Sequence, residues 1–489
     1  MRALLRHWFL PLLILLAAPA LAAQEIARNP LGAATDIRAA RGATTTLVSR
    51  IVYRDEAGGR VAILVGSDYA VTEIGVVTTV HDFRLRRTLQ LDTGNRRFIN
   101  RSAYSIAGFS DYELHNRQML KGILAAGGAD VLKAAPASIV DDFWIETDLS
   151  HSKNPAAIAG AALARSGNAF TVEYRGQRVA TFQPAEHRFP DVILANFYRA
   201  LRHVVVLHPG IIAEMRKTGQ IPQELMFTSW RPMQDRTQKQ LSLLSVDDIE
   251  VDYPLAPDFV PALDETLNID FRTHYAPLVI QALTGAVVDT RSTKDAYQRT
   301  ISASLSGGQN LDAALLALEM TLALTEDCNV QSDVCDLVRD TFAQTRHDTA
   351  VISLLTAKDQ EHNKQYQAAV DTLRGISRAG LRYGHILDLF IANDIVSAYL
   401  DRMATARETD KARFSADVKG YFEAALRGNT FLAGTYKDFG NFYFRQFYPQ
   451  EAWFLWDAGR SLPGRRTPNL LDAIGVFEKG LEQNYPWLF

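Results

Sequence analysis

Three prolines stand close together in the middle of the chain: Pro254, Pro257 and Pro261. Proline has no amide hydrogen to donate and a fixed φ, so it continues neither a helix nor a central strand. The hydrophobic pattern also changes here, because the residues before this point favour strands and those after it favour helices. We therefore expect residues 251–264 to be a linker between two domains.

Residues 44–250 have the pattern of an antiparallel sheet accompanied by helices. Segments rich in β-branched residues are separated by turn residues such as Asp55–Gly59. Apolar and polar residues mostly alternate over 83–91, which is typical of a strand with one face in water. Helical spacing over 110–126 adds a helix to the sheet. We predict an α+β domain, preceded by a flexible leader at 23–43.

Residues 265–489 favour helices nearly throughout and contain one clear repeat motif. Aromatic and small residues recur at helical spacing on two adjacent helices: Tyr436, Phe439, Gly440 and Tyr443, then Ala452, Trp456 and Gly459. This pattern resembles a tetratricopeptide repeat, although Phe439 stands where Leu is usual and the closing Pro463 comes one place early. The small side chains are expected to let two antiparallel helices approach closely.

The resemblance to tetratricopeptide repeats extends over residues 349–466, with weaker units before the clear one. About 34 residues earlier, Val418, Phe422 and Ala425 take the corresponding positions of a second helix. The resemblance implies an all-α helical-repeat domain that offers a concave surface to a protein partner. An irregular helical bundle is the alternative.

The first 22 residues have the three parts of a cleavable export signal. A basic start with Arg2 and Arg6 is followed by the apolar run Trp8–Ala18 and by small residues up to Ala22. This run is shorter than the roughly 20 apolar residues that span a bilayer. We expect cleavage near Ala22 and a periplasmic or secreted protein without a membrane span. An uncleaved anchor is the alternative.

The chain contains two cysteines, Cys328 and Cys335, between two segments with helical spacing. In an oxidising compartment, a pair placed in this way joins the tip of a helical hairpin. The pair is a poor zinc site, because no second Cys/His pair accompanies it. We predict a structural disulfide that contributes about 2–3 kcal/mol.

The sequence contains no complete catalytic or cofactor motif. Leu305–Gln309 matches the signature sequence of ABC-transporter ATPases, but no Walker A loop is present in the sequence. Glu113, Asn116 and Arg117 share one face of a helix and are candidate pocket residues, although such pairs are common on helix surfaces. An acidic group at 141–148 lacks the loop that calcium requires. We expect no cofactor and no metal.

The leading functional hypothesis is a non-enzymatic binding or scaffolding protein with a protein partner in the cell envelope. A formal net charge of −3 argues against nucleic acid as a partner. One alternative is a carrier of a lipid or lipoprotein in a curled N-terminal sheet, similar to the half-barrels of exported lipid-carrying proteins. A second alternative is a hydrolase whose residues converge only in three dimensions.

The end of the chain is unusually rich in aromatic residues. They are dense between Phe431 and Trp453, and the chain closes on the apolar segment Tyr485–Phe489. So many aromatic side chains are not expected to fit on one buried face, so we predict that some form a groove for a peptide. We expect the closing segment to pack against the last repeat.

Overall fold

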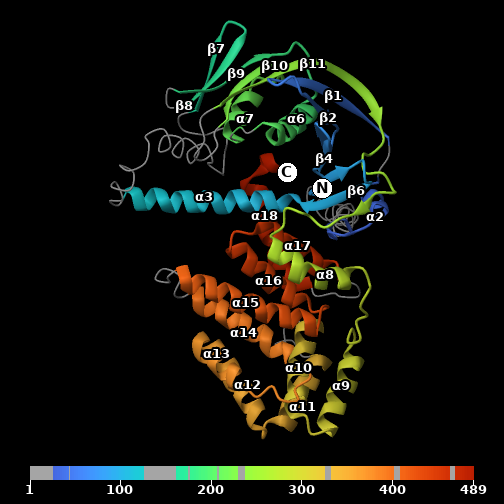
Figure 1. Cartoon of the computed structure of the whole chain (residues 1–489), viewed down its shortest axis with the longest axis vertical. Coiled ribbons are helices and arrows are strands. Elements are labelled where there is room, and N and C mark those ends of the chain that lie inside the picture. Colours follow the sequence, from blue (N-terminus) through green and yellow to red (C-terminus); the bar gives the residue numbers. More distant parts are fainter. Residues whose placement is uncertain are drawn as a thin grey trace, which may run out of the picture. The chain divides into compact units, whose positions relative to one another are not determined.

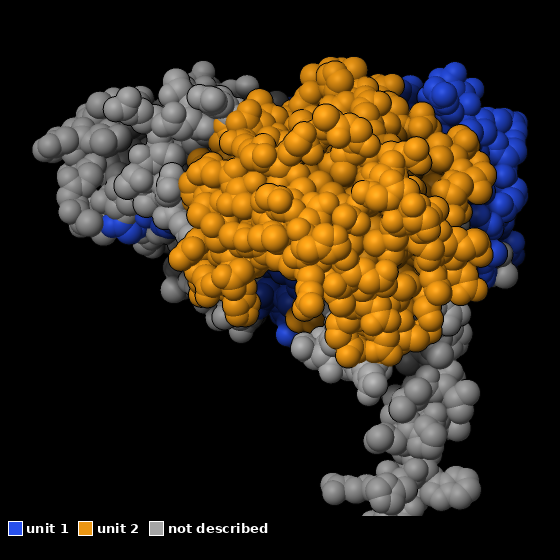
Figure 2. All heavy atoms as spheres, turned by 90° about the horizontal axis from the view of Figure 1, so that it is seen from below, with its two compact units in different colours: residues 1–264, 477–489 blue, residues 265–476 orange. Residues whose placement is uncertain are grey.

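The structure of the 489-residue chain is a computed structural model. It describes residues 26–42, 45–125, 161–174, 177–205, 207, 209–229, 237–324, 332–400, 408–462 and 468–489. The chain divides into two compact units (Figures 1 and 2). Unit 1 comprises residues 1–264 with 477–489, and unit 2 comprises residues 265–476. The predicted fold class is confirmed, because unit 1 is built on an antiparallel sheet with helices and the regular elements described in unit 2 are all helices.

Among its described residues, unit 1 contains one sheet of twelve strands in the order β12-β6-β5-β4-β3-β2-β1-β11-β10-β9-β8-β7. Neighbouring strands are antiparallel, except that β12 runs parallel to β6. The strands are β1 (Thr46–Asp55), β2 (Arg60–Val65), β3 (Tyr69–Ile74), β4 (Val77–Asp82), β5 (Arg87–Asp92), β6 (Arg97–Ser102), β7 (Ala161–Ser166), β8 (Ala169–Tyr174), β9 (Gln177–Pro184), β10 (Pro222–Ser229), β11 (Thr237–Val251) and β12 (Val260–Pro261).

The middle of this sheet is buried on both faces. Successive side chains of a strand point to opposite faces, and on β1 Ile51 and Tyr53 enter one core while Val48 and Val52 enter the other. The one-sided pattern that alternation over 83–91 suggested therefore does not describe the central strands. Their long apolar runs are the signature of a sheet that is covered twice.

Helices cover the two faces of the sheet. On one face, α6 (Asp191–Val204) and α7 (Pro209–Arg216) bury Phe197 and Met215 against the strands, and Figure 1 shows both helices beneath the arch of β10 and β11. On the other face, α2 (Ala34–Arg41) buries Ile37 with Tyr253 and Leu255. A longer helix, α3 (Ala103–Ala125), follows β6.

Two expectations about the edges of unit 1 were wrong. The flexible leader predicted at 23–43 contains helix α2, whose Arg41 is buried and contacts Asp82 at 2.9 Å. The linker predicted at 251–264 belongs to the sheet domain, because β12 pairs with β6 and Arg101 forms an ion pair with Asp264. Both segments are held in place by contacts with the rest of unit 1, which the local sequence does not indicate.

Unit 2 consists of consecutive helices, most of which pack against the next helix along the chain. Polar side chains cap the N-termini of several of these helices. Thr293, Ser332 and Asp348 each accept a hydrogen bond from a backbone amide of the first turn. The elements are η2 (Phe271–Tyr275), α8 (Ala276–Leu283), α9 (Lys294–Ser306), α10 (Asn310–Leu324), α11 (Asp333–Thr345), α12 (Thr349–His362), α13 (Tyr366–Gly375), α14 (His385–Leu400), α15 (Glu408–Gly428), α16 (Ala433–Arg445) and α17 (Pro449–Arg460).

Helix α10 lies among several other helices of unit 2. Its sequence is mostly apolar and has no distinct polar face, which is typical of a helix enclosed by others, and it contacts α9, α11, α12, α14 and α16. Within the described ranges, no helix is both long enough and apolar enough to cross a bilayer.

The last helix, α18 (Pro468–Asn484), leads into the short helix η3 (Pro486–Leu488), and residues 477–489 belong to unit 1. The phenyl ring of Phe489 packs on Tyr104 with ring centroids 5.0 Å apart, and Tyr485 donates a hydrogen bond to Asp111 at 2.7 Å. The expectation that this segment packs against the last repeat was therefore wrong. Its apolar residues complete the sheet domain instead.

Candidate functional site

Three helical hairpins of unit 2 share one turn geometry. The hairpins are α9–α10, α12–α13 and α16–α17, and each has one residue in the left-handed region: Gly308 (φ 70°), Lys364 (φ 60°) and Phe447 (φ 66°). In each hairpin, the amide of this residue bonds to the carbonyl three residues earlier, and the next amide bonds to the carbonyl five residues earlier. The second helix then begins two residues after the left-handed residue.

This shared turn is a helix C-cap of the Schellman type. It explains the segment Leu305–Gln309, in which Gly307 and Gly308 terminate α9 and the amide of Gln309 closes the turn onto the carbonyl of Ser304. The resemblance of this segment to an ATPase signature therefore follows from the residues that end a helix. The same geometry without glycine at the second and third hairpins shows that the hairpin, rather than glycine alone, fixes the turn.

The helices of the α16–α17 hairpin approach closely at its two glycines. A Cβ atom on Gly440 would lie 2.3 Å from Nε1 of Trp456, and one on Gly459 would lie 2.9 Å from Cβ of Tyr436. The indole of Trp456 also donates a hydrogen bond to the carbonyl of Lys437 at 3.1 Å. The remaining residues quoted for the repeat motif are buried here too: Phe439, Tyr443 and Ala452.

The aromatic residues of this region form a core rather than a groove. Phe271 and Tyr275 of η2 meet Tyr443 and Phe439 edge to face, with centroids 5.2 and 5.1 Å apart, and Phe422 of α15 stacks on Phe439. Three segments that are separate in the sequence therefore share these rings, which the density of aromatics alone did not indicate. Phe447 and Tyr448, at the turn between the helices, keep exposed fractions of 48% and 40%.

A buried carboxylate on α10 connects four segments of unit 2. Glu319 is fully buried and accepts hydrogen bonds from Arg291 Nε (3.0 Å), Tyr297 Oη (2.9 Å) and Asn429 Nδ2 (2.6 Å), and His385 Nε2 lies 2.6 Å from it. Burial alone would raise the pKa of Glu319, but His385 and Arg291 lower it to about 2. A buried charge with this number of partners is well compensated, so we interpret Glu319 as a structural centre.

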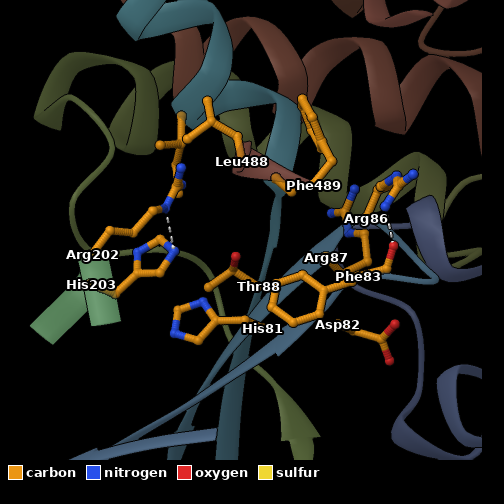
Figure 3. A pocket seen from close by; sticks show the side chains of 12 residues that line it. His81, Asp82, Phe83, Arg86, Arg87, Thr88, Arg202, His203, Leu488 and Phe489 are labelled. Carbon is orange, nitrogen blue, oxygen red and sulfur yellow. Dashed lines mark hydrogen bonds between the residues drawn. The ribbon is translucent and has the colours of Figure 1, made fainter. Parts of the chain in front are cut away.

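A second polar cluster lies in unit 1, where α6 meets the sheet. His81 of β4 and His203 of α6 stack with ring centroids 4.0 Å apart and an interplanar angle of 15°. Nε2 of His81 lies 3.2 Å from the Thr72 hydroxyl, and Arg202 Nε donates to His203 Nε2 at 3.1 Å. Figure 3 shows His81, Arg202 and His203 around one hollow, with Phe489 on its opposite side.

The hollow is lined by residues of five parts of unit 1. They come from the end of β4 with the turn that follows it, from the starts of β5 and α3, from the end of α6 and from the C-terminal segment: His81, Asp82, Phe83, Arg86, Arg87, Thr88, Ala103, Ile106, Arg202, His203, Leu488 and Phe489. The C-terminal wall is held by Glu482, which accepts hydrogen bonds from Arg86 Nε (2.9 Å) and Tyr104 Oη (2.6 Å).

Burial keeps both histidines of the hollow neutral. It lowers the pKa of His81 to about 3, with a further contribution from the charge of Arg202, and it lowers the pKa of His203 well below its ordinary value. A histidine that titrates so far below neutral pH is a weak general base. The cationic groups beside these rings, Arg86, Arg87 and Arg202, therefore dominate the chemistry of the hollow, which favours binding of an anion over acid–base catalysis.

Of the candidate pocket residues predicted on α3, Asn116 is not among the described residues that line this hollow. Asn116 is half-buried, and the side chains of Glu113 and Arg117 lie outside the described residues. Ala103 and Ile106 contribute to the hollow from the same helix. The pairing of His81 with His203 was missed, because the only sequence signal was two separate histidines in apolar surroundings.

Several other predictions fall on residues that the structure does not describe. The export signal, the acidic group at 141–148 and Cys328 lie outside the described ranges, so the disulfide stays a prediction. Cys335 is buried in the first turn of α11. Among the described residues, no three His, Cys, Asp or Glu side chains are arranged to hold a metal ion.

Comparisons with protein families, with curated proteins and with solved structures find no match for this chain.

Proposed function

We propose that this chain is an exported, non-enzymatic binding protein whose helical unit engages a protein partner in the cell envelope. The observation that carries this proposal is the turn geometry shared by α9–α10, α12–α13 and α16–α17. A unit built from recurring hairpins presents an extended surface, and such surfaces commonly bind other proteins. The export signal predicted for residues 1–22 is the basis for placing the protein in the cell envelope.

The surface for the partner is inferred from what the helical unit leaves uncovered. Helix α10 already occupies the side that α12, α14 and α16 share, and its Asp312 accepts hydrogen bonds from the amides of Arg382 and Tyr383 at 3.0 Å each. The outer side of α12 exposes Ile352 (48%) and Leu355 (41%), three residues apart and therefore on one face. We infer that this outer side, rather than a groove lined by α10, meets the partner.

The structure gives less support to a carrier of an apolar ligand. The central strands of the sheet are packed with side chains on both faces, and the hollow of unit 1 encloses about 10 Å³. That volume is close to the space of one water molecule. The carrier hypothesis stays a prediction.

Site-specific photo-crosslinking in intact cells tests the proposed function. A photoreactive residue at Ile352 or Leu355 should capture one defined protein, and the charged variant Ile352→Asp should abolish capture from Leu355. Val76 of unit 1, which is 93% exposed, is the matched apolar control position. The proposal fails if the α12 positions capture nothing, or only the proteins that position 76 captures.

A further inference from the structure

Four arginine side chains gather at the hollow of unit 1. Arg86, Arg87 and Arg202 line it, and Arg199 precedes Arg202 by about one turn of α6. The guanidinium of Arg199 lies over the ring of Phe83, another residue of the lining, at 5.3 Å. Strand β5, the turn before it and helix α6 therefore bring positive charge to one place.

Two of these arginines lack a negative partner among the described residues. Arg86 is paired with Glu482, as described above. By contrast, Arg199 donates to the amide oxygen of Asn196 at 2.9 Å, and Arg202 donates to the imidazole of His203 at 3.1 Å. Both acceptors are uncharged, so the charge of neither guanidinium is neutralised by a described carboxylate.

Each of these two guanidiniums also buries a nitrogen without an acceptor in the described part of the chain. The atoms are Nε of Arg199 and Nη1 of Arg202. Burial, together with neighbouring arginines, lowers the pKa of Arg199 to about 10 and that of Arg202 to about 9. Buried guanidinium groups are normally satisfied by carboxylate or phosphate oxygens, so this arrangement is incomplete without an anion.

The lining supplies one more hydrogen-bond donor and no competing free carboxylate. Figure 3 shows the hydroxyl oxygen of Thr88 directed into the hollow, between His81 and the Leu488–Phe489 wall. Asp82 also lines the hollow, but its carboxylate accepts from the Leu85 amide at 2.7 Å and from the Tyr253 hydroxyl at 2.9 Å.

We propose that this hollow is a phosphate-binding site, in which Arg202 and the Thr88 hydroxyl contact the phosphate oxygens and Arg199 adds positive potential. The planar fork of a guanidinium matches phosphate geometry. Two uncompensated cations also favour a dianion over a single carboxylate. The inference does not depend on the proposed function of the helical unit.

The size of the hollow limits what else the ligand carries. Its enclosed part has a volume of about 10 Å³, whereas about 310 Å³ of unfilled space, part of it open solvent, lies in and above it. A phosphate group therefore binds at the open side, and any group esterified to it remains outside. Free phosphate and the phosphate of a lipid head group share this chemistry.

Isothermal titration calorimetry of the mature protein with inorganic phosphate, at constant ionic strength in chloride, tests the site. We expect saturable binding that Arg202→Gln weakens by roughly tenfold or more, because a charge-assisted hydrogen bond is lost. Arg60→Gln is the matched control, since Arg60 is an exposed arginine at the start of β2, and it should bind phosphate like the unchanged protein. Co-sedimentation with vesicles tests whether the phosphate belongs to a lipid. In that case, the protein should sediment with vesicles that contain phosphatidic acid and not with neutral vesicles.

Two further variants separate loss of binding from loss of folding. Arg202→Lys keeps the charge without the fork, and Thr88→Val keeps the shape without the hydroxyl, so both should weaken binding while circular dichroism stays unchanged. The proposal is overturned if neither inorganic phosphate at millimolar concentration nor the phosphatidic acid vesicles bind. It is also overturned if Arg60→Gln weakens binding as much as Arg202→Gln, because the effect would then come from net charge alone.

Discussion

The two units bury charge in opposite ways. In unit 2, the carboxylate of Glu319 is surrounded by four polar side chains, so its charge is compensated on every side. In unit 1, Arg199 and Arg202 have uncharged partners and one buried nitrogen each without an acceptor among the described residues. A satisfied network holds a fold together, whereas an unsatisfied one indicates where a ligand binds. The predictions below test this difference.

The largest effect is expected from removing the compensated charge of unit 2. Glu319→Ala leaves Arg291 buried without its carboxylate, and breaking a buried pair in this way costs about 3–5 kcal/mol of unfolding free energy. Urea denaturation measures the loss. The control is Glu423→Ala, which removes an exposed ion pair with Arg427 on α15 and should cost at most about 0.5 kcal/mol. A loss below 1 kcal/mol for Glu319→Ala would show that the network is dispensable.

Close packing should make unit 2 sensitive to a single added methyl group. In Gly440→Ala, the new Cβ overlaps the Trp456 indole, and overpacking of this kind costs about 1–3 kcal/mol. Gly420→Ala is the matched control, because Gly420 is exposed on α15 and has open space at its Cβ. That substitution should stabilise the helix by up to about 1 kcal/mol. Equal effects of the two substitutions would contradict the close helix contact.

Acid should weaken unit 1 before it weakens the Glu319 network. The folded pKa of His81, about 3, lies below its value near 6.5 in the unfolded chain, so its stability contribution is complete above pH 6.5 and is lost as pH falls. The expected loss is about 1.5 kcal/mol between pH 6.5 and 5. The folded pKa of Glu319 is about 2, so its contribution is lost only below pH 4.5, its ordinary value.

Hydrogen exchange distinguishes the two pH windows, because peptides of β4 and of α10 report on different units. Exchange in β4 should accelerate between pH 6.5 and 5, after correction for intrinsic rates, while α10 stays protected. The groups that face His81 are Thr72 on β3 and His203 and Arg202 on α6. The variant His81→Asn should reduce the pH response to the part that comes from His203, whose pKa is also lowered by burial. Equal acceleration in both peptides would mean that the charge networks do not set the pH response.

The smallest effects should come from the shared hairpin turn. Gly308→Ala places a side chain at φ 70° and should cost about 1 kcal/mol, whereas Lys364→Gly relieves the same strain at φ 60° and should gain about 0.5 kcal/mol. Thermal melting detects both changes. If both substitutions shifted the melting temperature in the same direction, the left-handed residue would not be the source of strain in these turns.

The sequence predicted the features that depend on local chemistry. Turn residues and alternation placed the strands of the meander, helical spacing placed α16 and α17, and the small residues Gly440 and Gly459 lie where those helices meet. The boundary near Asp264 followed from the proline cluster, although the prolines themselves belong to unit 1.

What the sequence did not predict depends on contacts between distant segments. Helix α2 has little apolar signal of its own and is ordered by burial of Ile37 and by the ion pair of Arg41 with Asp82. The stack of His81 on His203 needs the register of β4 and the position of α6 together. Neither relation leaves a spacing pattern along the chain, so single-sequence reasoning has no signal to follow.

The partners of Glu319 have a consequence for how the helical unit comes apart. In an open-ended array of hairpins, units contact only their neighbours, and the array can unzip from either end. Here, one side chain of α10 is bound to residues that precede α9, begin α14 and follow α15. Removing α9, or the segment that contains α14 and α15, would take hydrogen-bond partners away from Glu319. Helices α9, α10, α14 and α15 are therefore expected to melt as one cooperative body.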